Sequence, residues 1–175
     1  MAITINGTTG IAGVDGSAST PAVQGSDTNT GVIFGTDTVS IVTGGSTRAT
    51  VDSSGNFQYN SGYGSVATVY GCRAWVNFNG TGTVAIRASG NVTSITDNGT
   101  GDYTVNITNA MPDINYATVV TYSQDYGVAR CMGAQLYLNS GTGAEVAPTT
   151  TAARIVTTTT TAAFDSKYVC VGIYR

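Results

Sequence analysis

Residues 72–108 read CRAWVNFNGTGTVAIRASGNVTSITDNGTGDYTVNIT, and this stretch decides the fold. In its first part, CRAWVNF, the apolar residues Ala74, Val76 and Phe78 alternate with other side chains, so neighbouring residues fall on opposite faces of a sheet. Trp75 breaks the apolar and polar alternation: either it faces outward or both faces of this strand are covered. Glycine turns close each run, which predicts a succession of short strands.

The composition favours strands along the whole chain. Leu136 and Leu138 are its only leucines, whereas the β-branched residues Thr, Val and Ile are abundant, and these suit a pleated surface better than a helix. The 23 glycines among 175 residues place frequent turns between short strands. We therefore predict an all-β chain that contains one compact domain and a thin extension.

Three segments follow from the pattern. Residues 1–58 hold short β-prone runs and few aromatics, so this segment is expected to finish burying its apolar side against neighbouring chains and to anchor the protein. Residues 59–66 are predicted to be a connector, and residues 67–175 a compact antiparallel β-sandwich. After residues 72–78, the sandwich strands are expected at 83–88, 91–97, 103–109, 116–123, 129–138, 154–160 and 167–175.

Charge and hydropathy restrict the partners. Charged residues make up 10% of the chain and the net charge is −3, so no basic surface for nucleic acid is expected. A surface rich in Thr, Ser and Asn can pack against copies of itself without burying many charges. No apolar run approaches the roughly 20 residues that a membrane-spanning helix needs, and no signal-peptide pattern follows Met1. We expect synthesis in the cytoplasm and no membrane insertion.

Catalytic and metal-binding groups are scarce. The chain has no His, which removes the common activating base and the commonest metal ligand, and its cysteines lack metal-binding spacing. Asp97 and Asp102 could form the acid pair of a glycan-cutting enzyme, but the sequence DNGTGD between strand-like runs favours a hairpin loop. We therefore predict no enzyme, no cofactor and no metal site, with weak Ca²⁺ binding by this loop left open.

The remaining candidate functional residues are three cysteines and one tyrosine-rich loop. Cys72, Cys131 and Cys170 lie far apart in apolar contexts, which predicts free and buried thiols. The loop YSQDYG, residues 122–127, offers Tyr122 and Tyr126 as flat contact faces with Asp125 as an acceptor between them, so it is the predicted receptor-binding site.

The runs QGSDTNTGVIFGTDTVSIVTGGSTRATVDSSGNF, residues 24–57, and AWVNFNGTGTVAIRASGNVTSITDNGTGDYTVNITNAMPDINY, residues 74–116, resemble tail-fibre and related adsorption proteins of tailed bacteriophages, especially phages of aquatic bacteria. The resemblance extends from about Pro21 to Tyr122. It implies a homotrimeric all-β appendage on the virion tail. Its N-terminal part would dock on other tail or baseplate proteins, and its C-terminal domain would contact a host cell-surface glycan or protein.

The chain is short for a fibre of this kind, and it lacks the long shaft or β-helix of fibres that degrade polysaccharide. The resemblance therefore implies binding rather than catalysis. A capsid-decorating cement protein, or a tail adaptor without receptor binding, is the alternative that the sequence leaves open.

Overall fold

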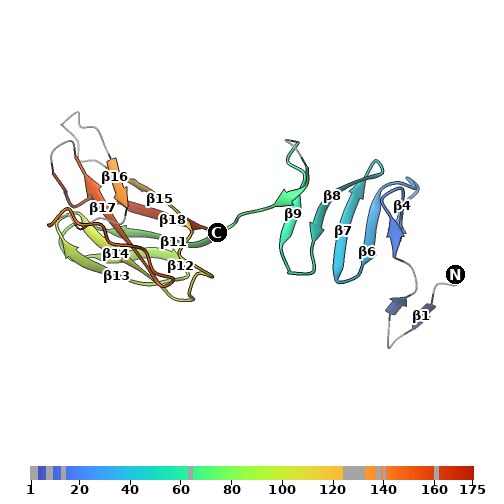
Figure 1. Cartoon of the computed structure of the whole chain (residues 1–175), viewed down its shortest axis with the longest axis horizontal. Coiled ribbons are helices and arrows are strands. Elements are labelled where there is room, and N and C mark those ends of the chain that lie inside the picture. The colour runs from blue at the N-terminus through green and yellow to red at the C-terminus, as the bar shows by residue number, and fades with distance from the viewer. Residues whose placement is uncertain are drawn as a thin grey trace. The chain divides into compact units, whose positions relative to one another are not determined.

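The protein is described from a computed structural model (Figure 1). The described residues are 4–6, 10–12, 15–62, 65–123, 133–136, 139, 141–159 and 162–175. Within these ranges the chain contains no helix, and every pair of neighbouring strands is antiparallel. The prediction of an all-β protein is confirmed.

The chain divides into two compact units, Met1–Val69 and Tyr70–Arg175. The predicted connector, residues 59–66, lies between β9 (Phe57–Tyr59) and β10 (Ala67–Thr68), and these two strands pair with each other. The residues that join them therefore belong to the N-terminal unit, and the division between the units comes a few residues later than the sequence indicated.

The N-terminal unit is built from short strands. Hairpins are formed by β1 (Thr4–Asn6) with β2 (Gly10–Ala12) and by β3 (Gly16–Ser17) with β4 (Thr20–Pro21). A six-stranded sheet follows in the order β10-β9-β8-β7-β6-β5, which adds β5 (Val23–Gln24), β6 (Gly31–Gly35), β7 (Thr38–Thr43) and β8 (Ser46–Val51). Gly44 and Gly45, both with positive φ, make the tight turn between β7 and β8.

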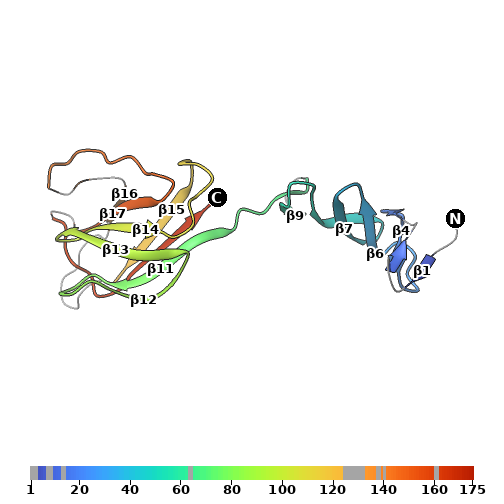
Figure 2. The ribbon, with the colours of Figure 1, turned by 90° about the horizontal axis from the view of Figure 1, so that it is seen from below.

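The C-terminal unit contains two four-stranded sheets, seen from two sides in Figures 1 and 2. One has the order β12-β11-β18-β15 and the other β13-β14-β17-β16. Their bounds are β11 (Cys72–Asn79), β12 (Ala85–Gly90), β13 (Val92–Gly99), β14 (Asp102–Ile107), β15 (Ala117–Tyr122), β16 (Gly133–Leu136), β17 (Ala152–Thr158) and β18 (Val169–Tyr174). Each strand predicted for residues 67–175 overlaps one of these observed strands.

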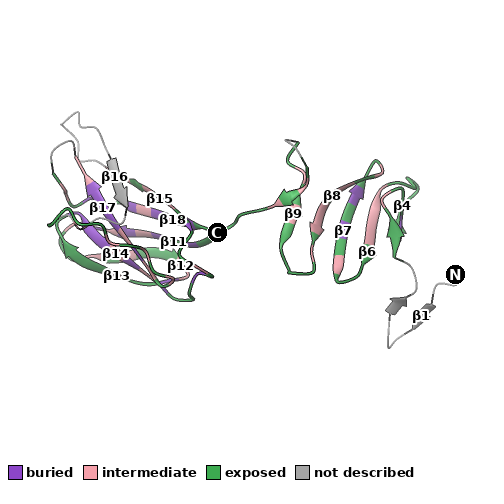
Figure 3. Cartoon of the chain, viewed as in Figure 1, coloured by how far each residue is buried: buried purple, intermediate pink, exposed green. Residues whose placement is uncertain are grey.

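Both sheets contribute to one hydrophobic core, an arrangement consistent with a β-sandwich. The core side chains come from alternate positions of the strands: Ala74, Val76, Phe78, Val105, Ile107, Ala153, Ile155, Val169, Val171 and Ile173 are all at most 5% exposed. The buried segments stand out in this unit in Figure 3. The Tyr103 ring packs edge-on against Phe78, with ring centroids 5.1 Å apart, and so joins the two sheets.

Candidate functional site

Tyr122 does not present an exposed face. It is the last residue of β15, and the alternation of that strand turns its side chain inward, opposite the buried Val169. Its ring packs edge-on against Phe164 at 5.5 Å, and its hydroxyl donates a hydrogen bond to the backbone oxygen of Thr158 at 2.6 Å. Tyr122 is thus a half-buried packing residue. The other two residues of the predicted receptor site, Asp125 and Tyr126, lie outside the described residues.

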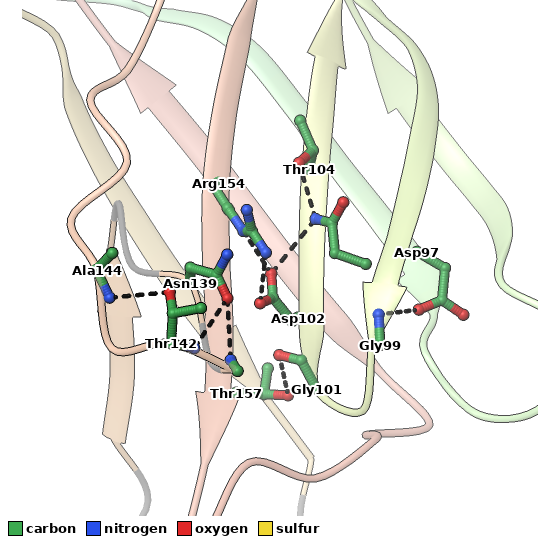
Figure 4. A network of polar contacts seen from close by, with 12 residues as sticks. Asp97, Gly99, Gly101, Asp102, Thr104, Asn139, Thr142, Ala144, Arg154 and Thr157 are labelled. Carbon is green, nitrogen blue, oxygen red and sulfur yellow. Dashed lines mark hydrogen bonds and ion pairs between the residues drawn. The ribbon is translucent and has the colours of Figure 1, made fainter.

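Asp97 and Asp102 lie in the β13–β14 hairpin, as the turn-forming sequence between them indicated. The Asp102 carboxylate is 1% exposed and accepts two bonds from Arg154, from Nε at 2.7 Å and from an Nη at 2.8 Å (Figure 4). Asp97 Oδ1 accepts the backbone N–H of Gly99 at 2.9 Å. The hairpin interpretation is confirmed, and both carboxylates have structural partners.

The described cysteines carry free thiols, but their burial differs from the prediction. Cys72 is exposed, and its Sγ donates to the backbone oxygen of Ala74 at 3.2 Å, whereas Cys170 is half-buried. Both cysteines lie on the outer side of the β12-β11-β18-β15 sheet. The apolar neighbours of Cys170 in YVCVGIY therefore did not indicate that its own side chain is buried. The prediction of a buried Cys72 is wrong, and Cys131 lies outside the described residues.

Within the part of the chain that the structure describes, no three or more His, Cys, Asp or Glu side chains gather in a way that could hold a metal ion. No helix in those residues is long and apolar enough to span a bilayer.

The most distinctive surface belongs to the N-terminal unit. Cross-strand pairs place one continuous set of apolar side chains on a single side of the six-stranded sheet, since directly paired residues share a face. We call this surface the apolar face; it consists of Val23, Val32, Phe34, Val39, Ile41, Ala49, Val51, Phe57, Tyr59, Ala67 and Val69.

The apolar face is open to solvent in the single chain. Eight of its residues are between 38% and 51% exposed: Val23, Phe34, Val39, Ile41, Val51, Phe57, Tyr59 and Val69. Counting a fully exposed aromatic side chain as roughly 200 Å² and an aliphatic one as about 150 Å², they leave on the order of 600 Å² of apolar surface uncovered. A contiguous apolar patch of this size is at the upper end of what a single chain typically exposes, and such patches are often functional.

The opposite side of the same sheet is polar. Ser40 and Thr50, which pair across β7 and β8, share a hydrogen bond of 2.7 Å there, and Gln58 Nε2 donates to the Asp52 carboxylate at 2.8 Å. Val42, fully buried, is the main apolar residue of that side. Most of the large apolar side chains of the sheet therefore lie on the side opposite these polar contacts.

No protein family, curated protein or solved structure matches this chain.

Proposed function

We propose that the protein is a structural subunit of a bacteriophage particle, a short tail fibre that assembles as a homotrimer. The observation that carries this proposal is the apolar face, because a single-layer sheet with eight half-exposed large apolar residues needs a covering surface. Copies of the same chain supply that surface with matching chemistry, since none of the residues of the apolar face is charged.

The size of the apolar face suits such an assembly. Burying on the order of 600 Å² per chain at about 25 cal/mol per Å² yields roughly 15 kcal/mol, which is comparable to the upper estimates of the cost of association, about 4–15 kcal/mol. The uncovered area also approaches the roughly 800 Å² that each partner buries in a standard interface. Two sheets could stack face to face or three could surround a common axis, and the resemblance to tail fibres favours three.

Within the particle, the N-terminal unit docks on tail or baseplate proteins and the C-terminal unit contacts a glycan or protein of the host surface. The protein is made in the host cytoplasm and ends in the virion tail. A rigid two-sheet unit holds exposed groups in fixed positions, which suits the receptor-facing role. Its low net charge of −3 and sparse cations do not favour nucleic acid as a partner.

A cement protein of the capsid, or a tail adaptor without receptor binding, is the second candidate. It is favoured by the inward orientation of Tyr122, which takes one aromatic out of the predicted receptor loop. Gold labelling of intact particles separates the two functions, because a fibre is found on the tail and a cement protein on the capsid shell.

The oligomeric state is tested by light scattering on the full chain. The proposal expects three times the 17.8 kDa of one chain. Ile41→Asp places a carboxylate in the middle of the apolar face and should weaken association at least a hundredfold, because an unpaired charge would be buried. A wild-type protein that stays monomeric at micromolar concentration would refute the proposal.

The matched control uses two adjacent residues of β5. Val23 lies on the apolar face and Gln24 on the opposite one, and both are exposed. Val23→Asp should weaken assembly, whereas Gln24→Asp should leave the mass unchanged. Equal effects of the two substitutions would show that charge alone, and not the buried face, governs association.

A further inference from the structure

A shallow groove lies on the outer side of the β12-β11-β18-β15 sheet in the C-terminal unit, with a volume of about 480 Å³. It follows β18, where the small residues Cys170 and Gly172 form the floor. Asn77 and Trp75 of β11 line one side, and β15 lines the other. Its lining residues are Cys72, Trp75, Val76, Asn77, Val119, Thr121, Cys170, Val171, Gly172 and Tyr174.

Two aromatic side chains of the groove occupy the space above glycines. A Cβ added to Gly90, which pairs with Trp75, would lie 2.4 Å from the indole Nε1, and one added to Gly172 would lie 3.0 Å from Cε2 of Tyr174. Neither glycine has the positive φ that would require glycine for the backbone. Since glycine within a strand weakens a sheet, these two positions are best explained by the room that the rings need.

The rings remain accessible and the groove is uncharged. Trp75 is 45% and Tyr174 39% exposed, and none of the lining residues carries a charge. Asn77 and Thr121 contribute an amide and a hydroxyl, and the Asn77 oxygen accepts a bond of 3.4 Å from Arg87. The groove thus combines two aromatic surfaces with neutral hydrogen-bonding groups.

We propose that this groove binds a neutral oligosaccharide. The apolar C–H face of a sugar ring packs on Trp75 or Tyr174, and its hydroxyls exchange hydrogen bonds with Asn77 and Thr121. The uncharged lining matches an uncharged ligand, and the volume falls within the range of about 300–1,000 Å³ that small-molecule sites occupy. This assignment rests on the proposed host-surface contact for its biological role and names the class of receptor.

A second copy of the chain fits this groove less well than it fits the apolar face. Apart from Thr43 and Ser46, which pair at one end of β7 and β8, the cross-strand pairs on the side of the apolar face are apolar, whereas here Val119 and the two rings alternate with Asn77 and Thr121. Packing a protein surface over such groups would bury polar atoms that need partners. A saccharide supplies those partners with its own hydroxyls.

Trp75 is the only tryptophan of the chain, so its fluorescence reports directly on the groove. Maltohexaose, cellohexaose and chitohexaose are titrated into the full-length protein, and at least one should give a saturable change in emission. The same sugar should slow alkylation of the exposed Cys72 thiol, which also lines the groove. Absence of a saturable change with all three sugars at millimolar concentration would overturn the proposal.

Calorimetry with variants tests the assigned residues. Tyr174→Ala and Trp75→Ala should each weaken binding at least tenfold, and Gly172→Ala should weaken it by displacing the Tyr174 ring. Tyr70→Ala is the matched control, because Tyr70 is a 70% exposed aromatic residue that does not line the groove. The affinity of this variant for the saccharide should be unchanged. Equal losses for Tyr70→Ala and Tyr174→Ala would refute the assignment.

Different results would contradict the assembly proposal and the saccharide-binding proposal. Ile41→Asp should dissociate the assembly yet keep saccharide binding, since Ile41 belongs to the other unit. If Trp75→Ala instead lowers the oligomeric mass, the groove is an interface between copies and the saccharide assignment is wrong. A monomeric wild-type protein that still binds a sugar would refute the assembly alone.

Discussion

Replacing Arg154 by Leu should destabilise the C-terminal unit far more than replacing its partner Asp102. The Asp102 carboxylate is 1% exposed, and it accepts hydrogen bonds from two guanidinium nitrogens of Arg154 and from Asn98 Nδ2 at 3.3 Å. The Arg154 side chain is 17% exposed. After Arg154→Leu a buried carboxylate is left without its cation, whereas after Asp102→Leu the guanidinium can turn toward water.

The asymmetry can be given a magnitude. Removing one partner of a buried ion pair costs about 3–5 kcal/mol, and this range applies to Arg154→Leu. For a unit of roughly a hundred residues, that loss lowers Tm by roughly 10–25 °C. Asp102→Leu should cost about 1–3 kcal/mol, because its orphaned group retains access to solvent.

Thermal unfolding followed by Trp75 emission measures this difference, because Trp75 lies in the same unit as the ion pair. The double variant Asp102→Leu/Arg154→Leu should recover most of the stability lost in Arg154→Leu, since no unpaired charge remains. An Arg154→Leu cost below about 1 kcal/mol would refute the reasoning.

Four further outcomes are expected. Gly101→Ala should cost at least about 2 kcal/mol more than Gly143→Ala in thermal unfolding: both have φ of +66°, but only at Gly101 would a Cβ meet backbone atoms, at 2.6–2.7 Å. Hydrogen bonds from Asn56 lower the pKa of Asp52. The β8–β9 turn should therefore lose stability as the pH falls below the ordinary value of 3.8 and through the lowered pKa of Asp52, and an NMR titration of the turn detects this loss. Cys72 should alkylate in the native protein faster than the half-buried Cys170, as peptide mapping would show. Unfolding of the N-terminal unit should depend on protein concentration, because its apolar face is covered only in the assembly.

The sequence predicted the fold where local pattern and turn chemistry agree. The alternation in residues 72–78 placed Ala74, Val76 and Phe78 in the core, and the turn residues between Asp97 and Asp102 predicted their hairpin. The order of the strands was not predictable in this way. β11 pairs with β18, about 90 residues further along the chain, and this pairing depends on the packing of the whole sandwich.

The candidate site was harder to predict because the exposure of an aromatic depends on its position in a strand. The sequence places Tyr122 both at the end of the strand expected at residues 116–123 and in the YSQDYG loop. In the structure it shares the inward side of β15 with Val120, as the period of two within that strand indicates. Trp75 was left between two orientations. Its 45% exposure shows that it faces outward, with its ring over Gly90 of the neighbouring strand β12, a placement that is evident only once the strands are paired.

The two exposed surfaces differ in what they require of a partner. In β7 the sequence TVSIV offers apolar residues to both sides, and the buried side chain is Val42 while Val39 and Ile41 remain uncovered. A flat set of aliphatic and aromatic groups gains from any apolar cover that removes it from water. The groove along β18 instead carries an amide and a hydroxyl between its rings, so a ligand with hydrogen-bonding groups of its own suits it better than an apolar surface does. We therefore propose that the N-terminal unit mediates assembly and the C-terminal unit recognition, because the side chains that the two units leave exposed differ in polarity.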